Sequence, residues 1–308
     1  MHVVHHASEL PARARRSCVA IGVFDGVHLG HQQIIRQTFA DAQQHEAACL
    51  VVTFDRHPNS VVAPARVPPL IQSLPQRTRS IAALGADFLW LIRFDRAFSE
   101  QTGEQFVRQL VRDFGPVARI CVGANFVFGH QRSGDVTLLK NLGRELNFSV
   151  HGMAAIALDG QVVSSTRIRE AIRKGDLDAA SQMLGRAYAL AGEVQRGDGV
   201  GRQLGVPTAN LNVTGLVLPP NGVYAIHARA GTRLFRGVMN LGVRPTLSQP
   251  EPRLQAEAHL FDFEGDLYGQ ELEVTPIARL REEQRFPSLA ALREQIGRDI
   301  EAARREFA

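Results

Sequence analysis

Two histidines flank a glycine in the segment "AIGVFDGVHLGHQQII", which covers residues 20–35. His28 and His31 follow an apolar, strand-like run and precede a helical pattern, and Gly30 lies between them. The amino end of a helix presents free N–H groups to anions, and a glycine there lets the backbone approach a phosphate closely. Two imidazoles at this point have the chemistry to bind phosphate oxygens and to stabilise charge that develops in phosphoryl or nucleotidyl transfer.

The same histidine pair has plainer interpretations. Two histidines near the start of a helix also fit a capping role with solvated rings. Zinc has less support, because the chain has no H-E-x-x-H pattern and no third ligand lies nearby in sequence. The G-x-x-x-x-G-K-[ST] phosphate loop is absent too. The motif by itself therefore leaves a phosphate site and a helix cap open.

A second candidate for anion binding lies in the segment "VVSSTRIREAIRKGDL". Ser164, Ser165 and Thr166 begin a helical pattern, and Arg167 and Arg169 fall in its first turn. Cations usually favour the carboxyl end of a helix, so arginines at the amino end are unfavourable unless an anion binds there. Hydroxyls, helix N–H groups and guanidinium groups together predict an anion site. The alternative is an ordinary Ser/Thr cap with solvated arginines.

Glycines and two oxygen donors meet in "RGDGVGRQLGVPTANL", residues 196–211. The glycines do not form G-x-G-x-x-G, and Pro207 stops the run, so a dinucleotide fingerprint is excluded. Thr208 and Asn210 are two residues apart, so in an extended segment they face the same way. Their oxygens suit a Mg²⁺ ion that also binds substrate phosphates. A mobile glycine-rich loop and a Thr/Asn turn network are the alternatives.

One acidic residue has a position suited to acid–base chemistry. Glu257 lies in "LQAEAHLF", where apolar residues alternate onto the opposite face of an expected strand. A carboxylate within reach of a hydroxyl nucleophile would act as its general base. The alternative is a solvated residue on the outer face of the strand.

Length and composition limit the class of protein. The 308 residues, 44% hydrophobic and 21% charged, are typical of a globular protein of about two domains. The 35 basic residues are dispersed and the net charge is +4, so we expect no nucleic-acid partner. No apolar run approaches the ~18 residues of a membrane span, and the first residues lack the apolar core of a signal peptide. Cys18, Cys49 and Cys121 lie in apolar runs, which indicates reduced thiols and a cytoplasmic location. The oligomeric state stays open, a homo-oligomer included.

The first ~185 residues have the pattern of an α/β domain. Strand-like and helical runs alternate, so parallel strands with right-handed crossovers are expected in an open, doubly wound, Rossmann-like sheet. The expected strands are residues 18–24, 48–54, 87–94 and 119–126, and the expected helices follow Gly30 and cover residues 99–112 and 133–146.

The pattern changes near Gly185–Ala189, which predicts domains of residues 1–186 and 187–308. The second domain has short alternating runs at 223–230, 234–241, 254–261 and 272–277, and the first two form a hairpin pattern. A final helix is expected at 288–307, with Ser288 as its N-cap. Its apolar stripe consists of Leu289, Leu292, Ile296, Ile300 and Ala303. We therefore expect a β-barrel closed by one helix.

The motifs "GVFDGVHLGH", "VGANFVFG" and "SSTRIR", in this order, resemble the N-terminal module of the bacterial bifunctional riboflavin kinase/FMN adenylyltransferases, often called FAD synthetases. That module is similar to the nucleotidyltransferase fold. The resemblance implies that Asn125 and Phe128 lie toward the flavin. It implies an ATP and phosphate site formed by Gly22, Phe24, Asp25, Gly26, His28, Gly30, His31, Ser164, Ser165, Thr166 and Arg167, with His28 and His31 catalytic.

The motifs "GRQLGVPTANL", "NGVYAI", "GVMNLGVRPT" and "EAHLFDFEGDLYGQELEV" resemble the riboflavin kinase module of the same family. The resemblance implies that Thr208 and Asn210 bind Mg²⁺ with ATP, and that Glu257 deprotonates the ribityl 5′-hydroxyl of riboflavin. It places ATP against Gly199, Gly201, Arg202, Gly205 and Pro207. The implied reactions convert riboflavin to FMN and then FMN to FAD, each with ATP as co-substrate.

The chain departs from the family pattern in three places. "DRHP" replaces the frequent Glu-Pro-His-Pro, "LIQSLPQRTRSI" lacks the usual Thr and acidic residues, and Val206 stands where Phe is frequent. These changes concern how flavin fits its site and the relative rates of the two reactions, not the type of reaction.

Two rival hypotheses are an adenylyltransferase whose barrel only binds flavin and a non-enzymatic flavin-binding protein. The second is disfavoured because the reactive residues named above are all present.

Overall fold

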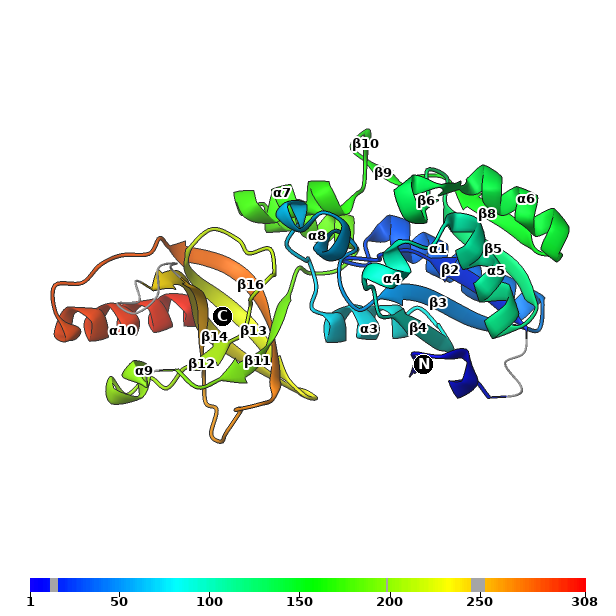
Figure 1. The fold of residues 1–308 in the computed structure, drawn as a ribbon. Helices are drawn as coiled ribbons and strands as arrows, with labels where there is room; N and C mark the ends of the chain where they lie inside the picture. The colour runs from blue at the N-terminus through cyan, green and yellow to red at the C-terminus, as the bar shows by residue number, and fades with distance from the viewer. Residues whose placement is uncertain (12–15, 198, 245–252) are drawn as a thin grey trace. The chain divides into compact units, whose positions relative to one another are not determined.

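The structure is a computed structural model that describes residues 1–11, 16–197, 199–244 and 253–308. The chain divides into two compact units (Figure 1). Unit 1 consists of Met1–Leu70, Leu74–Arg167 and Met183–Gly185, and unit 2 consists of Ile71–Ser73, Ile168–Gln182 and Arg186–Ala308. The domain limits 1–186 and 187–308 stay a prediction, and the segment Ile168–Gln182 groups here with unit 2.

Unit 1 contains a six-stranded sheet in which every neighbouring pair is parallel. Its strand order is β1 (His2–Val4), β4 (Phe88–Ile92), β3 (Ala48–Phe54), β2 (Ser17–Ile21), β5 (Val117–Gly123) and β8 (Ser149–Met153). The chain proceeds from β2 through β3 to β4 on one side and then continues on the other side with β5 and β8. This order confirms the predicted doubly wound sheet, and β2 is the point where its direction reverses.

Residues that alternate along the strands divide the core of unit 1 into two layers. On β2, Val19 and Ile21 face a cluster that includes Phe106 of α5 (Gly103–Phe114) and Leu139 of α6 (Val136–Leu146). The opposite face packs against α1 (Leu29–Gln44), through residues that include Cys18, Ala20, Cys49, Cys121, Ile34 and Ile35. Both faces of the sheet are covered, which explains why its strands are continuous apolar runs.

The remaining elements of unit 1 and of the segment after it are short. They are η1 (Ala7–Glu9), α2 (Asn59–Val62), η3 (Pro64–Arg66), α3 (Leu74–Ala82), α4 (Arg96–Ser99), β6 (Val127–Phe128), η4 (His130–Arg132), β7 (Gly134–Asp135), β9 (Ala157–Leu158), β10 (Gln161–Val162), α7 (Ser165–Lys174) and α8 (Leu177–Leu184). None of the helices within the described ranges is long and apolar enough to cross a membrane.

Unit 2 contains a closed antiparallel barrel, as predicted. Around the barrel the strands are β11 (Leu190–Gln195), β12 (Ala209–Leu211), β15 (Arg253–Leu260), β14 (Arg233–Arg244), β13 (Gly222–Ala230) and β16 (Glu271–Arg281). The expected hairpin is β13–β14, and a short helix α9 (Val200–Gln203) precedes β12. Pro245 and Thr246, at the end of "GVMNLGVRPT", lie outside the described residues.

The predicted C-terminal helix is α10 (Leu289–Arg305), and Ser288 caps it by accepting a hydrogen bond from Ala291 N. Ala303 is buried, and Ile300 packs with it against the barrel core. The prediction was wrong for Leu289, which is 63% exposed. This residue lies in the first turn of the helix, one turn before the apolar residues that reach the barrel.

Candidate active sites

The loop between β2 and α1 has an unusual backbone conformation. Phe24 and Val27 have positive φ angles of 51° and 39°, and Gly26 has 81°. Bulky residues are rarely found with φ above zero, so the surroundings must hold this loop in place. Phe24, Asp25, Val27 and His28 are all buried, which supplies the necessary packing. His28, the first histidine of the pair, therefore lies on a loop of fixed shape at the carboxyl edge of the sheet.

His28 is the N-cap of α1, and its Nδ1 accepts a hydrogen bond from His31 N at 3.4 Å. Since Nδ1 is the acceptor, neutral His28 carries its proton on Nε2. The two imidazole rings stack with their centroids 3.6 Å apart. A Cβ on Gly30 would lie 3.3 Å from His28 Cε1, so Gly30 leaves room for this ring. The capping role is therefore confirmed for His28, but its ring is buried rather than solvated.

His31 has an environment that disfavours the charged ring. Burial, then the neighbouring His28 and Arg77, holds the pKa of His31 well below its ordinary value. Its Nδ1 is buried and has no hydrogen-bond partner among the described residues. The edge of the ring contacts Phe24, with centroids 5.2 Å apart, and Gly22 leaves space for that phenylalanine. His31 is thus a neutral imidazole at neutral pH.

The "SSTRIR" segment lies beside this loop, although well over a hundred residues separate them in sequence. Ser165 Oγ donates to the carbonyl oxygen of Asp25 at 2.9 Å. Ser164 Oγ accepts from Arg167 N at 3.3 Å, so Ser164 caps α7, and Thr166 is exposed. The amino end of α7 and the histidine loop therefore meet, as an anion site that uses both would require.

Arg167 is held by a neighbouring hairpin. Its Nη1 donates to the carbonyl oxygens of Leu158 and Gln161, at 3.2 and 3.0 Å, in the hairpin formed by β9 and β10. Arg169 is buried. The two arginines at the start of α7 are thus not both solvated, contrary to the simplest capping interpretation.

The predicted flavin residues lie after β5. Asn125 is an exposed turn residue. Phe128 is partly buried, stacks on Phe126 with centroids 5.1 Å apart, and packs against the core beside Phe106. A Cβ on Gly134 would lie 2.7 Å from the Phe128 ring. The structure therefore places Phe128 as a packed residue, and its contact with flavin stays a prediction.

Sequence reasoning missed Arg77 of α3. This arginine is buried, and its guanidinium donates to the carbonyl oxygens of Val23 and Phe54, which follow or end strands β2 and β3. Burial lowers the pKa of Arg77, and nearby Asp25 and Asp55 oppose that change. In sequence it resembles any arginine on the polar face of a helix, so no local signal identifies it.

Replacing Arg77 by methionine should destabilise unit 1. The apolar side chain keeps the length but removes one of two side-chain donors to the carbonyl of Val23 and the guanidinium donor to that of Phe54, and a polar group that loses its partner typically costs about 1–3 kcal/mol of unfolding free energy. Trp90, the only tryptophan, lies in β4 and reports on this unit during urea unfolding. Arg79→Met, at an exposed position of the same helix, is the matched control. Equal effects of the two substitutions would contradict the role given to Arg77.

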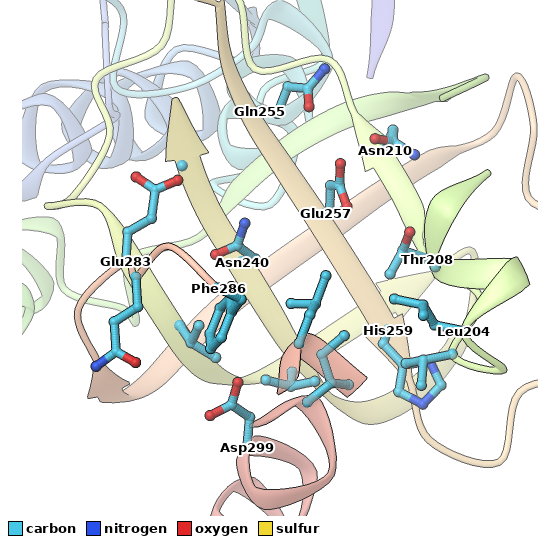
Figure 2. Close-up of a pocket in the computed structure, with 18 of the residues that line it drawn as sticks. Leu204, Thr208, Asn210, Asn240, Gln255, Glu257, His259, Glu283, Phe286 and Asp299 are labelled. Atoms are coloured by element: carbon cyan, nitrogen blue, oxygen red, sulfur yellow. The ribbon is translucent and has the colours of Figure 1, made fainter. Parts of the chain in front are cut away.

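Unit 2 contains a cavity of about 390 Å³. Three polar side chains form a row across its wall, because Glu257 of β15 pairs with Asn210 of β12 on one side and with Asn240 of β14 on the other. Directly paired residues on neighbouring strands share a face and have adjacent side chains. Figure 2 shows Glu257 on the middle strand, with Asn240 to one side and Asn210 and Thr208 to the other.

The sequence allows two interpretations of Glu257, a general base and a solvated residue on the outer face of its strand. The structure places its side chain in the cavity wall, while Ala256 and Ala258 on either side of it are buried on the opposite face. Thr208 and Asn210 line the same cavity, so the expectation that residues two apart face the same way is confirmed. The three residues that were singled out for chemistry in this unit thus meet at one site.

The glycine-rich segment packs against the two oxygen donors. A Cβ on Gly197 would lie 2.4 Å from the amide nitrogen of Asn210, and a Cβ on Gly201 would lie 3.1 Å from Thr208 Oγ1. Gly199 and Gly205 have positive φ angles of 71° and 79°. The segment is therefore shaped around Thr208 and Asn210, and glycine is needed for that contact.

The cavity includes residues that the sequence did not reveal. Gly199 and Gly201 line it, whereas Arg202, Gly205 and Pro207 are exposed and do not. Gln255 and His259 line it beside Glu257, as the alternation along this strand predicts, and the lining residues that were missed are Leu204, Asn240, Arg281, Glu283, Phe286 and Asp299. They come from strands of the barrel, from α10, from the loop before it and from the glycine-rich segment before β12. Only the tertiary fold, which the sequence does not contain, brings them together.

Two contacts fix the walls of this cavity. His259 Nδ1 lies 2.8 Å from the carbonyl oxygen of Pro207, directly before Thr208. Arg281 donates to both carboxylate oxygens of Asp299, at 2.8 and 2.7 Å, and so joins β16 to α10. Bidentate pairs of this kind fix geometry as well as charge.

Comparisons with known proteins agree with this division into two sites. Residues 10–167 match the family model for FAD synthetase, and residues 184–307 match the model for riboflavin kinase. The chain is 36% identical over 306 residues to the bifunctional riboflavin kinase/FMN adenylyltransferase of Escherichia coli strain K12, covering 99% of this chain and 96% of that protein. The chain belongs to this family.

Other bifunctional riboflavin kinase/FMN adenylyltransferases match over similar lengths. The protein from Pseudomonas fluorescens is 37% identical over 290 residues, which cover 94% of this chain and 93% of that protein. A solved structure from Streptococcus pneumoniae, described as a macrolide-efflux protein, has a TM-score of 0.80 at 26% identity and covers 98% of both chains. The family resemblance seen in the sequence motifs is therefore confirmed over nearly the whole chain.

Proposed function

We propose that the chain makes FAD from riboflavin in two ATP-dependent steps, one in each unit. Unit 2 phosphorylates riboflavin to FMN, and unit 1 transfers an adenylyl group from a second ATP to FMN. The observation that carries the proposal is the row of Asn210, Glu257 and Asn240 across the wall of one cavity. A barrel that only binds flavin does not need a carboxylate between two amides beside a glycine-rich segment.

In the kinase step, Glu257 accepts the proton of the ribityl 5′-hydroxyl of riboflavin. The oxygen then attacks the γ-phosphorus of ATP, and the bond between that phosphorus and the β,γ-bridging oxygen breaks, so the products are FMN and ADP. Asn240, opposite Glu257, is placed to orient either the carboxylate or the hydroxyl. The glycines at 199 and 201 line the cavity and present backbone N–H groups suited to phosphate oxygens.

Thr208 and Asn210 fit a magnesium ion. Both offer a neutral hard oxygen, both line the cavity, and Glu257 lies beside Asn210. Mg²⁺ bound with ATP would neutralise charge on the transferred phosphoryl group. The role of the protein is then to hold the two oxygen donors in place, which the packing of Gly197 and Gly201 achieves.

In the adenylyl-transfer step, a phosphate oxygen of FMN attacks the α-phosphorus of ATP, and pyrophosphate leaves. The nucleophile is already an anion, so no general base is needed. The chain contributes positioning and electrostatic stabilisation. His28 donates from Nε2, neutral His31 lies stacked on it, and the amino ends of α1 and α7 supply N–H groups for phosphate oxygens. Arg167 adds positive charge at the same edge of the sheet.

The substitution Thr208→Val tests the metal site. It removes one oxygen donor and keeps the shape, so the KM for Mg-ATP in riboflavin phosphorylation should rise about 10–100-fold. Formation of FAD from supplied FMN should be unchanged, because that step uses the other unit. Thr214→Val, at an exposed position, is the matched control. An unchanged KM in the Thr208 variant would remove this residue from the site.

The proposed function is tested by a time course. Purified protein is incubated with riboflavin, ATP and Mg²⁺, and the flavins are separated by chromatography. FMN that rises first and then gives way to FAD is the expected result. FMN alone would contradict adenylyl transfer in unit 1. No conversion of either riboflavin or FMN would favour a flavin-binding protein.

A cytoplasmic location is also proposed. Cys18, Cys49 and Cys121 are buried free thiols, which suits a reducing compartment. The partners that we propose are the small molecules riboflavin, FMN and ATP.

A further inference from the structure

A cluster of three metal-binding residue types lies in unit 1, apart from the histidine loop. It consists of Asp41 on α1, Cys121 on β5 and His151 on β8, and one ligand atom of each lies within 4.8 Å of the others. Cys121 and His151 are paired residues on neighbouring parallel strands, so their side chains share one face of the sheet, where Cys121 packs in the core cluster that includes residues of α1. Asp41 lies in the second half of α1, while His28 and His31 lie at its start.

The distances in this cluster fit a tetrahedral cation. Asp41 Oδ2 lies 3.2 Å from Cys121 Sγ and 3.3 Å from His151 Nδ1. Two ligands of a tetrahedral zinc ion with bonds of 2.0–2.3 Å are separated by about 3.3–3.8 Å. The two distances from Asp41 Oδ2 are therefore close to those between zinc ligands, and the ligand atoms of Cys121 and His151 lie within 4.8 Å of each other.

The surroundings also match those of a metal ligand. The other oxygen of Asp41 accepts hydrogen bonds from Gln37 at 3.0 Å and from Arg119 at 2.8 Å. Carboxylates that bind metals are oriented by such outer partners. The side chains of Asp41 and Cys121 are buried, whereas that of His151 is 40% exposed, which provides an entry path and room for a water ligand.

We propose that Asp41, Cys121 and His151 form a binding site for one divalent cation of the zinc type, with water as the fourth ligand. A carboxylate and a thiolate supply two negative charges, of which Arg119 offsets part at Asp41, and sulfur and imidazole select such an ion over Mg²⁺. On binding, the Cys121 thiol loses its proton to solvent, and His151 keeps a proton on Nε2 only. The ion would join α1 to β5 and β8.

The sequence gives no signal for this site. Its three residues lie on separate elements and form no spaced motif, so the absence of H-E-x-x-H did not bear on it. The cysteines were interpreted only as buried thiols. The parallel pairing of β5 with β8 and the packing of α1 are what bring the ligands together.

Titration of the full chain with Co²⁺, in excess Mg²⁺, tests the proposal by absorption spectroscopy. One equivalent should produce near-ultraviolet thiolate-to-cobalt charge transfer together with visible bands of tetrahedral intensity, and Zn²⁺ should displace both. His151→Ala, at a partly exposed position, and Cys121→Ala should abolish the charge-transfer band. Gln37→Ala should weaken binding about 10–100-fold. Cys18→Ala and His6→Ala should leave the spectrum unchanged.

Three results would overturn the proposal. One is cobalt binding without a charge-transfer band, which would indicate binding by histidines such as His2, His5 and His6. Another is a band that persists in both the Cys121 and the His151 variants. The third is a band that depends on Cys18 instead. All of these readouts are independent of flavin synthesis, so failure of this proposal is distinguishable from failure of the proposed function.

Discussion

Replacing Glu257 by glutamine should slow riboflavin phosphorylation by about 10²–10⁴-fold, the usual contribution of a positioned general base. Glutamine preserves the size of the side chain and its capacity for hydrogen bonds, but it cannot accept the proton of the 5′-hydroxyl. The loss should appear in kcat, with little change in the KM for riboflavin. It is measured as FMN produced over time, with ATP and Mg²⁺ saturating.

The same variant supplies an internal control. When FMN is provided, FAD formation by unit 1 should continue at the rate of the parent protein. Glu264→Gln, which changes an exposed carboxylate of unit 2, should affect neither step. Phosphorylation that survives in the Glu257 variant would show that this carboxylate is a structural member of the row, and the general base would have to be sought elsewhere in the cavity.

Replacing His28 by alanine should reduce FAD formation from FMN by about 10²–10³-fold, while riboflavin phosphorylation persists. This magnitude is typical of removing one preorganised donor to a developing negative charge. The products are measured with FMN and ATP as substrates, and separately with riboflavin and ATP. Loss of both activities would contradict the assignment of one reaction to each unit.

His28 also caps α1, so its two roles must be separated. Loss of an N-cap costs about 1 kcal/mol, which lowers stability without explaining a large loss of rate. Asparagine is a good N-cap residue but lacks the imidazole. His28→Asn should therefore recover most of the stability that His28→Ala loses and little of the activity. Activity that returns together with stability would reduce His28 to a capping residue.

The architecture of both units could be predicted because strong local patterns specify it. Strands β2 and β3 are apolar on both faces because the sheet is covered on both sides. Helix α1 is predictable because its buried apolar residues recur at helical spacing. Strand β1 has only three residues and forms only because β4 offers an edge for pairing. The exposure of Leu289 was not foreseeable either, because periodicity defines a stripe but not where the partner surface ends.

The candidate sites were predictable to the extent that each motif is local. Thr208 and Asn210 share a face through the two-residue repeat of a strand, and this could be derived without a fold. Asn240 became visible only through the register that pairs it with Glu257. Arg77 was hidden for a different reason, since a buried guanidinium that binds backbone carbonyls has the same sequence pattern as a solvated one.

The register around Glu257 has a consequence for how the kinase unit acquires its activity during folding. The row depends on two antiparallel pairings: that of the consecutive strands β14 and β15, and that of β12 with β15, which joins distant segments of the chain. Such non-local pairings form slowly, and a slip of one residue would turn Glu257 to the opposite face of the strand. Phosphoryl transfer should therefore be acquired in the step that closes the barrel, and a chain that is still folding carries no partly active kinase site.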